Sequence, residues 1–74
     1  MVVEIELFGQ LLPGKPRKQT MEITKPETAR DLAMTLGLNP EDIGLVTING
    51  VQSDLNDLVH SGSRLCFFPY ITGG

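Results

Sequence analysis

Apolar and polar residues alternate at the start of the chain and again after a short connector. Every second residue from Val3 to Leu7 is apolar, and the residues between them are glutamates. A period of two places the apolar side chains on one face of a β-strand, so the pattern predicts a half-buried strand over residues 2–8. Residues 18–24 repeat the alternation after the turn signal Pro13-Gly14. The two predicted strands are therefore expected to pair as a hairpin.

The hydrophobic period then lengthens, which marks a change from strand to helix. The i, i+3, i+4, i+7 spacing of one helical face is met by Ala29, Leu32, Ala33 and Leu36. Thr28 is a candidate N-cap and Gly37 a stop signal, so a helix is predicted near residues 28–36. After it, Asn39-Pro40 has the residue types that cap and open one further short turn.

Two more long strands are predicted in the second half of the chain. Residues 45–48 are each apolar or β-branched, and Asn49-Gly50 after them is a strong signal for a tight turn into a short return strand. Residues 64–68 form the last predicted strand. This strand and the one over residues 2–8 have the most apolar character, so we expect them at the centre of the sheet.

The order of these elements predicts an α+β fold of the β-grasp, or ubiquitin-like, type. A mixed sheet of four to five strands with one main helix on one face buries the apolar side of both layers, and right-handed crossovers limit the topology. Residues 1–70 are expected to form this domain, and residues 71–74 a flexible tail. The expected core residues are Val3, Ile5, Leu7, Ile23, Leu32, Leu36, Val46, Ile48, Leu65 and Phe67.

Composition narrows the classes of function. The 74 residues are 41% hydrophobic, which is enough for one small core and leaves little room for a deep active site. The net charge is −3 and the basic residues are spread out apart from the segment 15–18, so no nucleic-acid surface is expected. No run of residues is long and apolar enough to span a membrane, and the N-terminus does not have the pattern of a signal peptide. With one cysteine, the chain is expected to be cytoplasmic.

The end of the sequence carries its most specific motif. An apolar run from Leu65 to Tyr70 leads into Ile71-Thr72-Gly73-Gly74. Glycine has no Cβ, so a Gly-Gly tail can enter a narrow channel and present a free α-carboxylate there.

This ending resembles that of the small subunit of molybdopterin synthase, which typically reads Gly-Asp-Glu-Val-Ala-Phe-Phe-Pro-Pro-Val-Ser-Gly-Gly. The positions that agree outright are Phe67, Phe68, Pro69, Gly73 and Gly74. Two further segments match residue patterns that are usual in that family: Leu7-Phe8-Gly9-Gln10-Leu11 and Ile48-Asn49-Gly50. The departures are Ser63-Arg64 in place of an acidic pair and Tyr70 in place of the second proline.

The resemblance implies that the chemistry takes place at Gly74, next to Gly73. A carboxylate has no leaving group, so it must first become an acyl-adenylate, which a persulfide or sulfide can attack to leave a thiocarboxylate. The sequence contains no phosphate-binding Gly-rich loop. This chain is therefore expected to bind no cofactor, and Mg-ATP is expected to be used by a ubiquitin-activating-type adenylyltransferase.

The resemblance also implies two further partners, a sulfur-donor protein and the large subunit of molybdopterin synthase. The chain would then donate sulfur in the synthesis of the molybdenum or tungsten cofactor without being catalytic alone. Because strand alternation cannot bury both Phe67 and Phe68, we expect Phe68 to be an exposed contact for a partner, together with Pro69-Tyr70-Ile71-Thr72. The alternative is that a helix end or a loop covers Phe68, so that it is buried as well.

The remaining reactive side chains are interpreted as structural. Cys66 is expected to face outward as a small partner-facing residue, because nothing obvious in the sequence lowers the pKa of its thiol. His60 is expected on the surface, and the acidic pairs Asp54/Asp57 and Glu41/Asp42 in loops and caps.

Three other functions share the same features. The sulfur carrier of thiamine synthesis has the same fold and Gly-Gly ending, but usually lacks the Phe-Phe-Pro run. A ubiquitin-like modifier joined to protein lysines through Gly74 needs the same adenylate. In the last alternative, the domain is an interaction module and its Gly-Gly ending is incidental.

Overall fold

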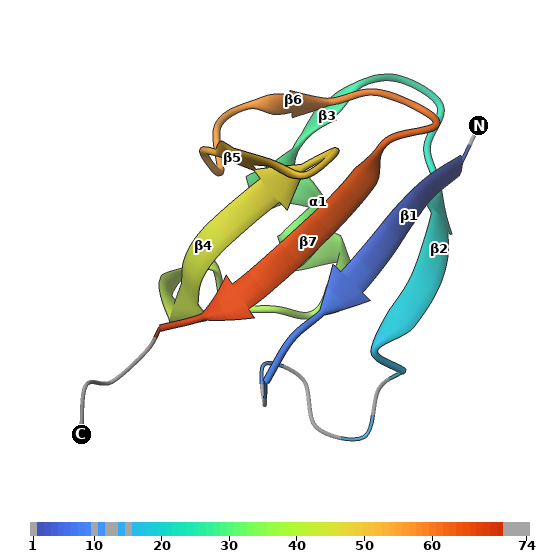
Figure 1. The fold of residues 1–74 in the computed structure, drawn as a ribbon. Helices are drawn as coiled ribbons and strands as arrows, with labels where there is room; N and C mark the ends of the chain where they lie inside the picture. Colours follow the sequence, from blue (N-terminus) through green and yellow to red (C-terminus); the bar gives the residue numbers. More distant parts are fainter. Residues whose placement is uncertain (1, 10, 12–13, 15, 71–74) are drawn as a thin grey trace.

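The computed structural model describes residues 2–9, 11, 14 and 16–70. Within this part of the chain, five strands form a mixed sheet in the order β2-β1-β7-β4-β5, and β3 pairs with β6 in a separate ribbon (Figure 1). The elements are β1 (Val2–Leu7), β2 (Lys18–Glu22), β3 (Glu27–Thr28), α1 (Ala29–Leu36), the 3-10 helix η1 (Pro40–Asp42), β4 (Ile43–Ile48), β5 (Val51–Ser53), β6 (Leu58–Val59) and β7 (Arg64–Pro69).

The first and last strands lie side by side at the centre of the sheet, as the sequence predicts. β1 and β7 run parallel, with Ile5 opposite Leu65 and Leu7 opposite Phe67, and both flanking pairs are antiparallel. Parallel neighbours require a crossover connection, which here carries α1 and β4. The predicted β-grasp arrangement is confirmed.

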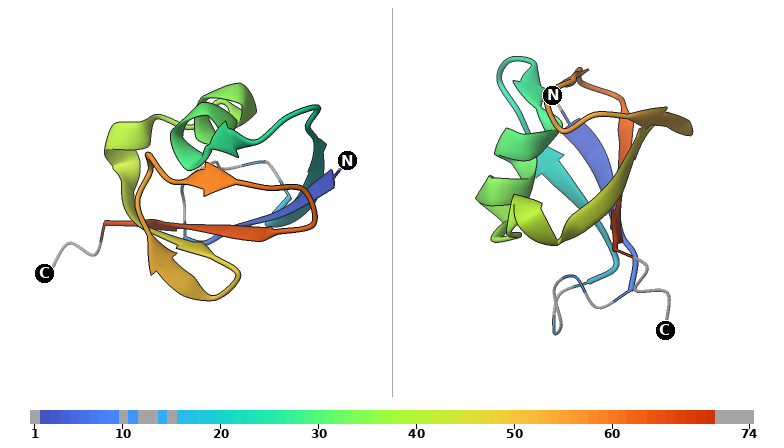
Figure 2. Two further views of the ribbon diagram at one scale, coloured as in Figure 1. Left: turned by 90° about the horizontal axis from the view of Figure 1, so that it is seen from above. Right: turned by 90° about the vertical axis from the view of Figure 1, so that its left-hand side faces the viewer.

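The helix covers one face of the sheet (Figure 2). The Thr28 hydroxyl accepts a hydrogen bond from the backbone N–H of Asp31 at 3.1 Å, and Gly37 ends the helix with a φ of 94°. Leu32 is 1% exposed, so the predicted apolar face of the helix does enter the core. The predicted cap and short turn at Asn39-Pro40 are also present, as the start of η1.

The sequence did not predict the ribbon of β3 and β6. Each strand has only two residues, which is too short to show a period of two. The ribbon brings the segment 55–57 to the start of α1, where the N–H groups of Ala29 and Arg30 donate to the carbonyls of Asp57 and Leu55. These bonds satisfy helix donors that have no partner within the helix.

Most of the predicted core is buried, with two exceptions. Leu36 and Ile48 are only half-buried and pack at the edge of the core. The second strand ends at Glu22, two residues earlier than predicted, yet Ile23 beyond it is buried. The core also includes Ala29, Ala33, Leu38, Ile43 and Val59. No helix of the described residues is long and apolar enough to cross a membrane.

Truncation of a central core residue should destabilise the domain strongly. Phe67 is fully buried between Leu7 and Val46, so we expect Phe67→Ala to lower the free energy of unfolding by about 3–5 kcal/mol. Urea unfolding followed by circular dichroism measures the change. Phe68→Ala, one residue further along the same strand, should cost clearly less, and the reverse order would mean that the two faces of β7 have been assigned wrongly.

Candidate functional site

The face of the sheet opposite α1 carries the candidate site. Within the described residues, no helix covers this face (Figure 2). Period-two alternation brings to it the residues of β1 and β7 that point away from the core. Its charged half lies over the middle of the sheet, and its apolar half lies where β1 and β7 end. The two halves differ in chemistry.

The apolar half consists of Phe8, Leu45, Phe68 and Tyr70, which we call the apolar patch. The rings of Phe8 and Phe68 stack with their centroids 4.4 Å apart and their planes 9° from parallel. Leu45 is opposite Phe68 in the pairing of β4 with β7. Leu45, Phe68 and Tyr70 line a hollow of about 300 Å³. The patch is therefore one continuous apolar surface built from three segments.

Much of the apolar patch is open to solvent. Tyr70 is 62% exposed and Leu45 36%, while Phe8 and Phe68 are half-buried against each other. A cluster of exposed apolar side chains on a small domain is typical of a surface that binds another protein. Phe68 does point away from the core, as predicted, and Phe8 covers part of it.

Backbone bonds hold the patch at the end of the sheet. The N–H of Phe8 donates to the carbonyl of Phe67 at 3.0 Å, which continues the β1–β7 pairing past the end of β1. The N–H of Leu7 donates to the carbonyl of Arg17 at 2.7 Å, and the guanidinium carbon of Arg17 lies 5.8 Å from the centroid of the Phe8 ring. A cation over an aromatic ring is favourable, so Arg17 helps to orient Phe8.

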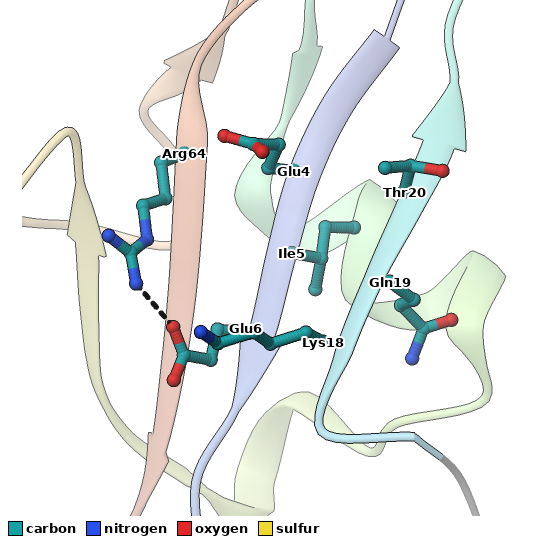
Figure 3. Close-up of a pocket in the computed structure, with 7 residues that line it drawn as sticks. All are labelled: Glu4, Ile5, Glu6, Lys18, Gln19, Thr20 and Arg64. Carbon is teal, nitrogen blue, oxygen red and sulfur yellow. Dashed lines mark hydrogen bonds and ion pairs between the residues drawn. The ribbon is translucent and has the colours of Figure 1, made fainter.

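The charged half is centred on one ion pair. Figure 3 shows the Arg64 guanidinium pointing at the Glu6 carboxylate, with Glu4, Lys18 and Thr20 around the same hollow. The contact between Arg64 Nη2 and Glu6 Oε1 is 2.5 Å, and the Glu6 side chain is only 10% exposed. The hydrogen bond from Arg64 lowers the pKa of Glu6 from its ordinary value, although burial acts in the opposite direction.

The burial of Cys66 contradicts one prediction made from the sequence. It lies on the outward face between Glu6 and Thr47, as alternation requires, but it is only 8% exposed. Its neighbours cover the small side chain, so Cys66 does not contribute an accessible partner-facing surface as expected.

The other candidate residues have the structural roles expected of them. His60 is exposed. Asp57 and Asp54 accept hydrogen bonds from the backbone N–H groups of Asp54 and Asn56, within one loop. Glu41 and Asp42 belong to the short helix η1. Among the described residues, no group of three or more His, Cys, Asp or Glu side chains could hold a metal ion.

The sequence-based site is only partly within the described chain. Phe68, Pro69 and Tyr70 lie together at the end of β7. Ile71-Thr72 and the predicted reaction site Gly73-Gly74 lie outside the described residues, as does the predicted flexibility of the tail.

Two residues of the apolar patch, Phe8 and Leu45, were not predicted from the sequence as part of the site. Phe8 continues the outward-facing series of Glu4 and Glu6, so its position was available from the period of two. The outward face of Leu45 follows in the same way from the predicted inward positions of Val46 and Ile48. Its place opposite Phe68 does not, because that depends on the pairing of β4 with β7, which shifts register between Ile43 and Leu45.

Comparison with known proteins finds similar structures at low sequence identity. No family model and no curated protein sequence matches it. The structure of SAMP1 from Haloferax volcanii superposes with a TM-score of 0.76 at 23% identity, over 100% of both chains. The complex of subunits 1 and 2 of molybdopterin-converting factor from Helicobacter pylori contains a chain that matches with a TM-score of 0.64 at 21% identity, again over 100% of both chains.

The fold is the ubiquitin-like β-grasp. A second structure from H. volcanii, of small archaeal modifier protein 1, gives a TM-score of 0.74 at 22% identity and covers 95% of this chain and 98% of its own. At these identities the similarity establishes the fold alone.

The ion pair makes a testable contribution to stability. Because the pKa of Glu6 is lower in the folded chain than in the unfolded one, ionised Glu6 stabilises the fold at pH values above its ordinary, unfolded-state pKa. This contribution is lost as the pH falls through the lower, folded-state pKa. Thermal melts from about pH 6 downward should therefore show a smaller acid-induced loss of stability for Glu6→Gln than for the parent.

The matched control is Glu4→Gln, an exposed position two residues earlier on the same face of β1. It should retain the acid sensitivity of the parent. Identical profiles for Glu6→Gln and the parent would show that the ion pair does not contribute to acid stability.

Proposed function

We propose that this protein is a carrier whose Gly74 carboxylate is activated by a partner adenylyltransferase and then converted to a thiocarboxylate. The observation that carries the proposal is the position of the apolar patch, on the uncovered face of the sheet at the end of β7. In the sequence, Ile71-Thr72 and then Gly73-Gly74 follow after Tyr70. A partner that binds the patch therefore receives the chain end that follows Tyr70.

The chemistry divides between the two proteins. A Gly74 carboxylate oxygen attacks the α-phosphorus of ATP, and pyrophosphate leaves. A sulfide ion then attacks the carbonyl carbon of the adenylate, AMP leaves, and a thiocarboxylate remains. This chain supplies the carboxylate and the docking surface, and the partner supplies the Mg-ATP site. Tethering the sulfur to a docked domain makes its later transfer effectively intramolecular.

The substrate of that transfer is proposed to be a molybdopterin precursor bound to the large subunit of molybdopterin synthase. Two features support this choice. The Phe67-Phe68-Pro69 run with Gly73-Gly74 is similar to the ending of the synthase small subunit. One structural neighbour is a chain in a complex of the two subunits of molybdopterin-converting factor.

A second candidate function is supported equally by the structural neighbours. Two structures of SAMP1, the small archaeal modifier protein 1 of H. volcanii, have the same fold over nearly the whole chain. In this alternative the Gly74 adenylate is attacked by a lysine amine instead of sulfide, and an amide bond to another protein forms as AMP leaves.

Incubation of the protein with its adenylyltransferase, Mg-ATP and sodium sulfide tests the activation step. We expect the intact mass to rise by the difference between sulfur and oxygen, because one terminal oxygen is replaced. Deletion of Gly74 should abolish the change without altering the melting temperature. An unmodified parent chain would contradict the carrier function, and lysine-linked adducts in cell extract, without sulfur incorporation, would favour the modifier.

The apolar patch should provide much of the partner affinity. Removal of the aromatic ring in Phe68→Ala should weaken binding to the adenylyltransferase by roughly tenfold or more, as expected for an aromatic anchor. Isothermal titration calorimetry measures this loss. Met34→Ala is the control, because Met34 is 59% exposed but lies on α1 on the other side of the sheet. Equal affinities for the two variants would exclude the patch as the docking surface.

A further inference from the structure

Two glycines enclose the point at which the chain leaves the sheet. β7 lies between β1 and β4, so Gly9, just after β1, and Gly44, within β4, flank its end from opposite sides. A β-carbon at Gly44 would lie 2.8 Å from the Cα of Tyr70 and 2.9 Å from both the Tyr70 nitrogen and the Pro69 oxygen. A β-carbon at Gly9 would lie 2.7 Å from Cγ of Pro69. Carbon atoms that are not bonded do not approach this closely.

The two glycines differ in what they require. Gly9 has a φ of 67°, which itself favours glycine, and its close neighbour is the Pro69 ring. The backbone of Gly44 does not have a positive φ, so its conformation does not itself favour glycine. Gly44 is needed only for space, and the atoms next to it are backbone atoms that no side-chain rotation can move.

Gly44 also lies at the irregularity of the sheet. Ile43 is opposite Pro69 and Leu45 is opposite Phe68, so Gly44 is the extra residue between two pairs. A bulge of this kind bends a strand and redirects what lies beside it. The bulge presses the backbone of Gly44 against that of Pro69 and Tyr70.

We propose that Gly9 and Gly44 form a notch that sets the direction in which the chain leaves β7, and that they are positioning residues for reaction at the tail. The inference rests on the proposed activation of Gly74. Docking through the apolar patch fixes the position of the domain on its partner, and the notch fixes the direction of the Pro69-Tyr70 backbone. A side chain in the notch displaces the Pro69-Tyr70 backbone, and the carboxylate beyond it no longer meets the partner's ATP.

The test uses the full chain with Gly44→Ala and follows pyrophosphate release by the adenylyltransferase in the presence of sulfide, with this protein as the varied substrate. We expect kcat to fall by roughly 10- to 100-fold, as for a misplaced reacting group, while KM stays within about twofold of the parent. Phe68→Ala should show the opposite result, a raised KM with a kcat close to that of the parent. The matched control is Gly50→Ala, which places a side chain at a positive φ of 81° but has no atom within 4 Å of its β-carbon.

A second measurement does not depend on activity. Residual dipolar couplings in a weakly aligning medium report the orientation of the Tyr70 N–H bond relative to the sheet. This orientation should change in Gly44→Ala and stay the same in Gly50→Ala. If the parent is never activated, the proposed function fails, and the couplings still decide whether the notch exists. If the parent is active and Gly44→Ala retains both its kcat and its Tyr70 orientation, the inference is wrong.

Substitution of Gly9 provides an independent test if Gly44→Ala does not fold. Gly9→Ala should lower kcat in the parent background, because its methyl group meets the Pro69 ring. In the Pro69→Ala background, where the ring is absent, adding Gly9→Ala should have a clearly smaller effect. An equal effect in both backgrounds would show that Gly9 acts only through its backbone conformation, which would remove it from the notch.

Discussion

The parallel pairing of β1 with β7 is the constraint on which the rest of the structure depends. Parallel strands end at the same edge of a sheet, so the residues that follow β1 meet the end of β7. Phe8 therefore stacks on Phe68, and Gly9 lies beside Pro69. An antiparallel pairing would have placed Val2 at this edge, without an aromatic partner for Phe68.

One strand serves two surfaces of the domain. Leu65 and Phe67 of β7 are fully buried against the helix side, while Arg64 and Phe68 belong to the uncovered side. The alternation separates the core residues from the residues that bind a partner in the proposed function, since the two sets are different side chains. In the same strand Cys66 is enclosed by its neighbours, which leaves the ion pair and the apolar patch as the two chemically distinct parts of this face.

The proposed function assigns docking and reaction to different parts of the chain. In this proposal, binding energy comes from side chains on the sheet, whereas the reacting atoms belong to the Gly74 backbone, which has no side chain to guide it. A reaction arranged in this way depends on the direction of the connecting segment as much as on affinity. The close approach of Gly44 to Tyr70 supplies a structural means of fixing that direction.

Local patterns in the sequence were sufficient for the strands, the helix with its Thr28 cap, and the inward positions of residues such as Leu32, because each depends only on near neighbours in the chain. The Gly73-Gly74 motif and the outward-facing Phe68 before it were also recognised from the local sequence. The shift of register in β4, the cover over Cys66 and the contact of Gly44 with Tyr70 were decided by the tertiary structure. Each arises where segments distant in the sequence are paired, and periodicity within one segment does not encode the register of another.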